Sequence, residues 1–187
     1  VRKATLNNYG DIQRKQVAIG APVWIRRSND VIPEIMGRVG EPVEGERPII
    51  PPACCPACGS VLVERGAHLF CLNRATCRPQ AIARMTHFAS RDAMDIETFS
   101  EKTAQQLAEQ LNVAEPQDLY ALTAEQLLAL DGFKEKKAQN LVKAIDVSRT
   151  RKLDAFIFAL GIPNIGRKTA RDLAERFGSM DALRTAD

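Results

Sequence analysis

A ten-residue pattern of apolar and polar positions occurs three times in the second half of the chain, at residues 98–107, 132–141 and 164–173. Each copy has an apolar second residue, Lys at the fifth position, Ala at the seventh and Leu at the tenth. From the Ala onward, apolar residues recur at i, i+3, i+4 and i+7, the spacing of one helix face. The copies begin 34 and 32 residues apart, a period typical of one supersecondary unit.

We therefore predict three equivalent units, in which a tight turn precedes a helix with one buried face. The predicted buried residues are Ala104, Leu107, Ala108 and Leu111 in the first copy, Ala138, Leu141, Val142 and Ile145 in the second, and Ala170, Leu173, Ala174 and Phe177 in the third.

The repeated lysine lies on the other side of each predicted helix. Lys102, Lys136 and Lys168 precede the buried Ala by two residues, about 200° around a helix of 3.6 residues per turn. A cation in the first turn opposes the helix dipole, which favours anions at this end. Backbone N–H groups at a helix start, beside a lysine, suit phosphate. The alternative is a stack of helical repeats, which has a similar period.

The phrase resembles the helix-hairpin-helix motif of proteins that bind the DNA backbone, whose turn reads Gly-apolar-Gly. Glycine permits a positive φ and close approach of phosphate. The second copy keeps only Gly132, with Lys134 in place of the other glycine, and the third keeps only Gly166, with Asn164 in place of the first. The first copy has neither glycine. We therefore expect the second and third turns to contact phosphate and the first mainly to pack against neighbouring elements.

Charged residues are distributed unevenly along the second half of the chain. The 187-residue chain has a net charge of +3, which alone does not indicate a partner. Residues 103–133 hold five acidic and no basic residues, whereas residues 134–152 hold seven basic and two acidic ones. Because the change falls at the second turn, it favours a basic surface facing phosphates, although a solvated helix face is the common origin of such runs. No run approaches the roughly 18 apolar residues of a membrane span, so we expect no membrane partner.

The cysteines predict a metal site. Cys55 and Cys58 have the C-x2-C spacing of a zinc knuckle with a trailing glycine, and Cys71 and Cys77 follow. Four thiolates complete a tetrahedral site and leave no position for water, so the zinc is expected to be structural. The surrounding segment of about 25 residues is too short for an apolar core, and metal binding should stabilise it. Disulfides or free thiols are the alternative, but five cysteines is an odd number.

Three further residues near this site have ligand chemistry. Cys54 adjoins Cys55, and adjacent cysteines rarely ligate one ion without strain, so we leave Cys54 out of the ligand set. His68 and His87 are alternative ligands. Because the four cysteines already complete a site, we expect both histidines to be surface or packing residues.

The amino-terminal segment has the pattern of β structure. Residues 22–27 and 31–39 predict two strands separated by a turn at 28–30, and Pro33 suggests an edge strand or a bulge. Residues 41–52 hold four prolines and three glutamates and are predicted to be a linker. Because the segment before it is short for a barrel, we expect the chain to begin inside a domain.

These parts, in this order, resemble the bacterial NAD-dependent DNA ligases over nearly the whole chain. The barrel of that family carries V-x-R-A-T-L-H-N and R-x-G-D-V-I-P, and residues 1–8 and 27–33 stand in those places. Lys3 replaces Arg, Asn7 replaces His and Asn29 replaces Gly. Lysine keeps a cation but loses the paired fork of arginine. Two further phrases match the family's zinc element and its entry into the hairpins, at residues 55–59 and 88–95.

The resemblance implies a multi-domain α+β fold with a partial OB-type β barrel and linker at 1–52, a four-cysteine zinc finger at 53–78 and an all-α helix-hairpin-helix domain at 79–187. Three of the family's four hairpin motifs are present, and a fourth would start near residue 196, about the same spacing further on. The family also carries a terminal BRCT domain, which these residues do not contain.

The resemblance also implies nick sealing in duplex DNA during replication and repair, by a cytoplasmic and monomeric enzyme. The family's adenylated lysine lies in a Lys-x-Asp-Gly motif that these 187 residues lack, so we expect no catalytic residue and no self-adenylation here. NAD and Mg²⁺ would bind outside this chain. Sequence-independent contacts with nicked DNA are expected from Gly132, Lys134, Lys136, Gly166, Lys168, Lys102, Lys3 and Arg27, and zinc ligation from Cys55, Cys58, Cys71 and Cys77.

Two other classes of function remain open from the sequence. The chain could be the zinc and helix-hairpin-helix module of another repair or recombination factor. It could instead be a helical scaffold that binds protein, in which case its affinity would be indifferent to DNA.

Overall fold

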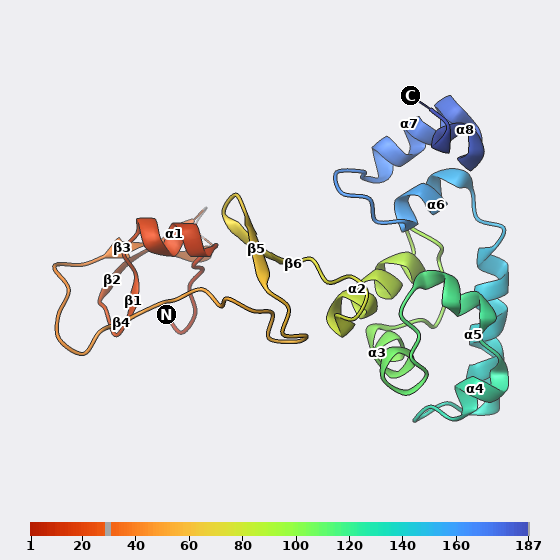
Figure 1. Ribbon diagram of the computed structural model, residues 1–187, viewed down its shortest axis with the longest axis horizontal. Coiled ribbons are helices and arrows are strands. Elements are labelled where there is room, and N and C mark those ends of the chain that lie inside the picture. Colours follow the sequence, from red (N-terminus) through yellow and green to blue (C-terminus); the bar gives the residue numbers. More distant parts are fainter. Residues whose placement is uncertain (29–30, 187) are drawn as a thin grey trace. The chain divides into compact units, whose positions relative to one another are not determined.

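The computed structural model describes residues 1–28 and 31–186, which form two compact units, residues 1–73 and residues 74–187. Figure 1 follows the chain through short strands and one helix in the first unit to helices in the second. The mixture of strands and helices agrees with the predicted multi-domain α+β class.

The predicted pair of strands forms an antiparallel hairpin in the first unit. β2 (Val23–Ser28) pairs with β3 (Ile32–Arg38), and the register shifts between Trp24 and Ile25. Pro33 lies in β3 opposite Arg27, and its carbonyl accepts a hydrogen bond from the Thr5 N–H at 2.9 Å. The predicted turn, including Asn29, lies partly outside the described residues.

A short helix and a further pair of strands accompany this hairpin. The Lys15 Nζ lies 2.7 Å from an Asp11 carboxylate oxygen at the end of α1 (Tyr9–Arg14). The hydrogen bond from Lys15, followed by one from Asn7, lowers the pKa of Asp11 to about 2. β1 (Ala18–Ile19) pairs with β4 (Arg47–Pro48). The predicted linker at 41–52 therefore contains a strand.

The sheets of this unit are small. β5 (Leu62–Arg65) pairs with β6 (His68–Cys71), so each sheet among the described residues has two strands. None of these described sheets closes into a barrel, which limits the predicted barrel to short antiparallel pairs.

The second unit consists of helices around one apolar core. The helices are α2 (Arg78–Ala89), α3 (Glu101–Gln110), a 3₁₀ helix (Pro116–Ala121), α4 (Ala124–Leu128), α5 (Glu135–Ser148), α6 (Leu153–Ala159), α7 (Arg167–Phe177) and α8 (Met180–Arg184). Fully buried side chains at the centre of this core include Met85, Leu107, Leu119, Leu127 and Leu141.

The three copies of the sequence pattern form equivalent elements. In each copy the helix begins three residues after the pattern starts, as α3, α5 and α7. Ala104, Ala138 and Ala170 are fully buried, which confirms the predicted inward face. Leu111 in the first copy and Val142 in the second are only partly buried, and in α7 so is the rest of the face, including Leu173.

Candidate metal centre and phosphate-binding turns

Four cysteines converge on one point. The sulfur atoms of Cys55, Cys58, Cys71 and Cys77 all lie within 4.8 Å of one another. The Cys58 and Cys71 sulfurs are 3.6 Å apart, close to the roughly 3.8 Å expected in a tetrahedral site with metal–sulfur bonds of about 2.3 Å. The four cysteines are therefore positioned to hold a metal ion.

Local backbone structure brings each sulfur to this point. Gly59 has a φ of 73° and its N–H donates to the Cys55 carbonyl at 2.8 Å, which closes the turn between the first two cysteines. Cys71 ends β6 opposite Leu62. Cys77 is the N-cap residue of α2. The trailing glycine of the knuckle thus supplies the left-handed conformation that the turn requires.

The chemistry of the donor set suits a soft or borderline cation. Hydrogen bonding to the Ser60 hydroxyl, followed by the Ser60 backbone, lowers the pKa of the Cys58 thiol to about 6. A thiolate is the form of cysteine that ligates metal. Cys55 and Cys77 are buried, and the other two sulfurs belong to partly exposed residues. Four thiolates around one point are the donor set of structural zinc.

The other residues with ligand chemistry lie outside the cluster. Cys54 is exposed and is absent from the group of four. His68 is exposed. His87 instead forms a 2.9 Å hydrogen bond with the Phe158 carbonyl and packs edge-on against the Phe158 ring. The predicted surface and packing roles of the two histidines are confirmed.

The three turns before α3, α5 and α7 share one backbone conformation. The first residue of each pattern has a positive φ, of 65° at Thr98, 73° at Gly132 and 67° at Asn164. The third residue is the helix N-cap and is extended in every copy. Gly166 has a φ of −83°, which other residues adopt freely. The glycines lost from the pattern are therefore not needed for the shape of the turn.

The helix starts differ in what caps them. The Ser100 hydroxyl accepts a hydrogen bond from the Thr103 N–H at 3.2 Å and so occupies the first turn of α3. Lys134 and Gly166, at the same place before α5 and α7, form no side-chain cap. Lysine has no acceptor atom and glycine has no side chain. The N-cap side chains therefore leave the first-turn N–H groups of α5 and α7 uncapped, unlike those of α3.

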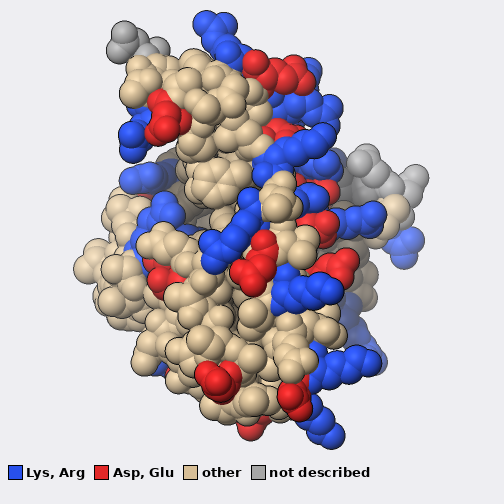
Figure 2. All heavy atoms as spheres, turned by 90° about the vertical axis from the view of Figure 1, so that its right-hand side faces the viewer, with Lys and Arg blue, Asp and Glu red and all other residues tan. Residues whose placement is uncertain are grey.

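All of the residues predicted to contact DNA are exposed. These residues are Lys3, Arg27, Lys102, Gly132, Lys134, Lys136, Gly166 and Lys168. The three repeated lysines therefore point away from the core as predicted. Figure 2 shows Lys and Arg side chains spread over the face that it displays, with Asp and Glu among them.

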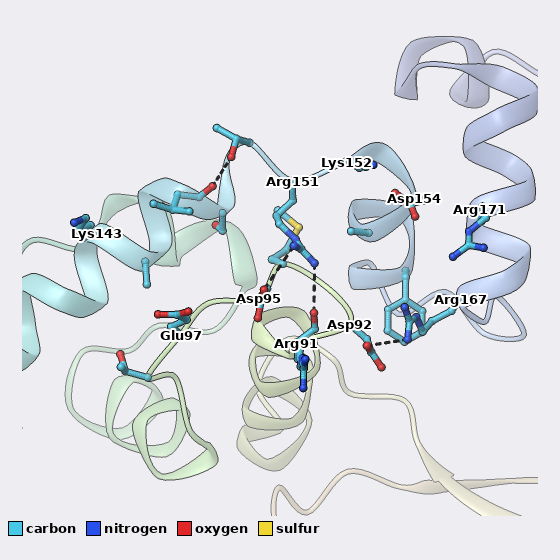
Figure 3. Close-up of a pocket in the computed structure, with 18 of the residues that line it drawn as sticks. Arg91, Asp92, Asp95, Glu97, Lys143, Arg151, Lys152, Asp154, Arg167 and Arg171 are labelled. Carbon is cyan, nitrogen blue, oxygen red and sulfur yellow. Dashed lines mark hydrogen bonds and ion pairs between the residues drawn. The ribbon is translucent and has the colours of Figure 1, made fainter.

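A cleft that the sequence did not predict lies in the helical unit. It has a volume of about 850 Å³ and is lined by the segment from Arg91 to Thr98, by α5, by the α5–α6 connection and by α6 and α7. Figure 3 shows Arg151 reaching toward the segment that carries Asp95, and Arg167 reaching from α7 toward Asp92. Its basic residues are Arg91, Lys143, Arg151, Lys152, Arg167 and Arg171.

Comparison with known proteins agrees with this arrangement. Residues 1–47 match the family model of the NAD-dependent DNA ligase OB-fold domain. Residues 90–146 match a SAM-like helix-hairpin-helix tandem and residues 155–187 a helix-hairpin-helix motif. Relatives named DNA ligase, from Alkaliphilus oremlandii and Alkaliphilus metalliredigens, are 58% and 56% identical over all 187 residues. DNA ligase 1 of Clostridium acetobutylicum is 54% identical over the same length.

Over its full length the chain is similar to part of these DNA ligases, and its first 47 residues match the OB-fold domain of the NAD-dependent ones. It spans 28% of the length of each of these relatives. The first two turns fall in the matched tandem and the third in the matched motif. The cysteine cluster lies between the first two matched ranges, at 55–77. Among the described residues, no helix has the length and apolar character needed to span a lipid bilayer.

Proposed function

We propose that this chain is the DNA-holding part of an NAD-dependent ligase that seals nicks in duplex DNA. The proposal places barrel strands at 1–52, a zinc finger at 53–78 and hairpin units at 79–187 on the DNA backbone. Binding is independent of base sequence, because its contacts go to phosphates. The assembly works in the cytoplasm as a monomer during replication and repair.

One observation carries this proposal. The helices α5 and α7 each begin at a left-handed turn, and neither N-cap residue forms a side-chain hydrogen bond to the first-turn N–H groups. An exposed lysine lies in the first turn of each helix, Lys136 in α5 and Lys168 in α7. This combination of free N–H donors, helix dipole and cation is the chemistry that binds phosphate. Two such turns in one unit suit a chain of phosphates rather than a single anion.

The metal of the four-cysteine cluster is proposed to be zinc. Cys55, Cys58, Cys71 and Cys77 would supply all four ligands, so zinc would stabilise the fold rather than activate water. NAD and Mg²⁺ would bind outside these residues, because the sequence lacks the Lys-x-Asp-Gly motif of the adenylated lysine. The isolated chain is expected not to adenylate itself.

The binding proposal is tested by titrating the chain with a fluorescent nicked duplex at several salt concentrations. Each neutralised phosphate contributes about −0.9 to the slope of log affinity against log salt. Contacts from both turns predict a slope of about −1.8 or steeper. A slope near zero would overturn the proposal and favour a protein-binding scaffold. The parent gene should also encode a Lys-x-Asp-Gly motif upstream of Val1, and its absence would contradict the ligase assignment.

The zinc proposal has its own test in metal content. The purified chain should carry about one zinc per molecule. Cys58→Ser and Cys71→Ser should lose it and open residues 53–78 to protease, whereas Cys54→Ser, outside the cluster, should keep it. Zinc retained in both ligand variants would contradict the proposed site.

A further inference from the structure

We propose that the basic cleft of the helical unit is a second phosphate-binding site, which holds a backbone phosphate of the bound DNA strand between the first and third turns. This inference rests on the proposed DNA-holding function and assigns it a site separate from the turn N–H groups. The cleft lining includes Thr98 of the first turn and Arg167, the first residue of α7.

The cleft has the side chains that phosphate recognition uses. Four of its six cations are arginines, whose planar guanidinium groups match two phosphate oxygens at once. Its acidic residues number four, so its lining is net positive; they are Asp92, Asp95, Glu97 and Asp154. The one aromatic side chain in the lining, Phe158, is partly buried and packs against His87. The cleft lining therefore offers a nucleobase no exposed aromatic ring for stacking, and its chemistry suits the phosphate backbone of DNA.

Two of the arginines are already oriented by carboxylates. The Arg167 guanidinium lies 2.8 Å from an Asp92 oxygen, and the Arg151 guanidinium lies 3.6 Å from an Asp95 oxygen. The Arg151 Nε also donates to the Ala93 carbonyl at 3.3 Å. The side chains of Arg167 and Asp92 are 60% and 53% exposed, so their pairing is weak. A phosphate can replace the carboxylate at an arginine that is already in place.

Other cations in the cleft have no such partner. Arg91, Lys143, Lys152 and Arg171 are exposed and form no ion pair within 4.0 Å among the described residues. Figure 3 shows Arg171 on α7, one turn beyond Arg167. Arg167 and Arg171 are four residues apart and so lie on one face of that helix. Together they present two guanidinium groups to one edge of the cleft, one held by Asp92 and one unpaired.

The test compares two arginines of the same helix. Arg171→Gln removes a cleft cation, whereas Arg176→Gln makes the same charge change outside the cleft lining. With a nicked duplex as probe, Arg171→Gln should weaken binding and lessen the salt slope by about 0.9, the loss of one phosphate contact. Arg176→Gln should leave both nearly unchanged. Equal effects of the two variants would overturn the cleft site.

The carboxylates provide a second variant with the opposite sign. Asp92→Asn removes a negative charge from the cleft and frees Arg167, so affinity for the nicked duplex should rise severalfold. A purely structural ion pair predicts lower thermal stability and unchanged affinity, and that result would contradict the proposal. Because Asp92 is exposed, the variant should fold, and circular dichroism checks this.

Titrations with other anionic ligands distinguish DNA from other molecules that could supply the bound anion. Inorganic phosphate and polyglutamate are titrated against the original chain and Arg171→Gln. If Arg171→Gln loses binding of inorganic phosphate or polyglutamate but keeps its DNA affinity, the cleft binds a free anion or an acidic protein. That result would overturn the DNA site. If the original chain shows no salt-dependent DNA binding, the proposed function fails. If it binds DNA and Lys136→Ala and Lys168→Ala weaken it while Arg171→Gln does not, only the cleft proposal fails.

Discussion

The first and third turns share one backbone conformation, but they differ in whether a side chain caps the N–H groups at the helix start. Thr98 and Asn164 both adopt a left-handed conformation, with φ of 65° and 67°. A serine side chain then fills the helix start in the first turn, whereas Gly166 leaves it open in the third. Under the proposed function, the first copy serves packing and the third serves phosphate binding. What separates the two roles is the occupant of the first-turn N–H groups.

Burial provides the largest contrast between the two copies. Leu107 in α3 is fully buried, whereas Leu173, at the same pattern position in α7, is only partly buried. Leu107→Ala should lower the free energy of unfolding by about 2–5 kcal/mol, since it creates a cavity. Leu173→Ala should cost about half as much or less. Urea unfolding followed by helical circular dichroism checks this, and equal losses would contradict a packing role specific to the first copy.

Substitutions at the first residue of each turn, which is left-handed, should change the free energy of unfolding by a smaller amount and with opposite signs in the two turns. Thr98 is β-branched, and such a residue with a positive φ is strained. Thr98→Asn should raise the free energy of unfolding by about 1 kcal/mol, because Asn tolerates this region. Asn164→Thr should lower it by about 1 kcal/mol. Thermal unfolding of the two variants measures the two changes in stability. Changes of the same sign would show that the surrounding side chains, rather than the backbone conformation, determine the stability of the turn.

Exchanging the N-cap residues of α7 and α3 should have the smallest effect on the free energy of unfolding. Gly166→Ser should place a hydroxyl on the first turn of α7, and open space around Gly166 leaves room for the side chain. Stability should rise by a few tenths of a kcal/mol, while DNA affinity should fall because the hydroxyl takes the N–H donors. Ser100→Gly should do the reverse at α3. Unchanged affinity in Gly166→Ser, measured by nicked-duplex titration, would count against binding at the helix start.

The sequence predicted the elements that rest on local spacing. The i, i+3, i+4, i+7 pattern located α3, α5 and α7, and the cysteine spacing located the four-cysteine cluster. Both depend on residues close together in the chain, whose geometry is fixed by the helix period or by a tight turn.

The glycines of the pattern do not mark the positions that the turn conformation requires. The position that requires a positive φ is the first residue of each turn, and Thr98 and Asn164 occupy it without glycine. Gly166 has an ordinary φ, so its small size matters for access to the helix start. The cleft was missed for a different reason. Arg91, Arg151 and Arg171 meet only through the packing of distant segments, which leaves no periodic signal in the sequence.

The central claim, that the turns before α5 and α7 hold DNA phosphates, is tested most directly by the repeated lysines. Lys136→Ala combined with Lys168→Ala should lessen the salt slope for nicked-duplex binding by about 1.8, two phosphate contacts. Lys102→Ala, at the same pattern position in the first turn of the capped α3 helix, should change the slope far less. An unchanged slope in the double variant, or an equal effect per lysine in all three turns, would contradict this account.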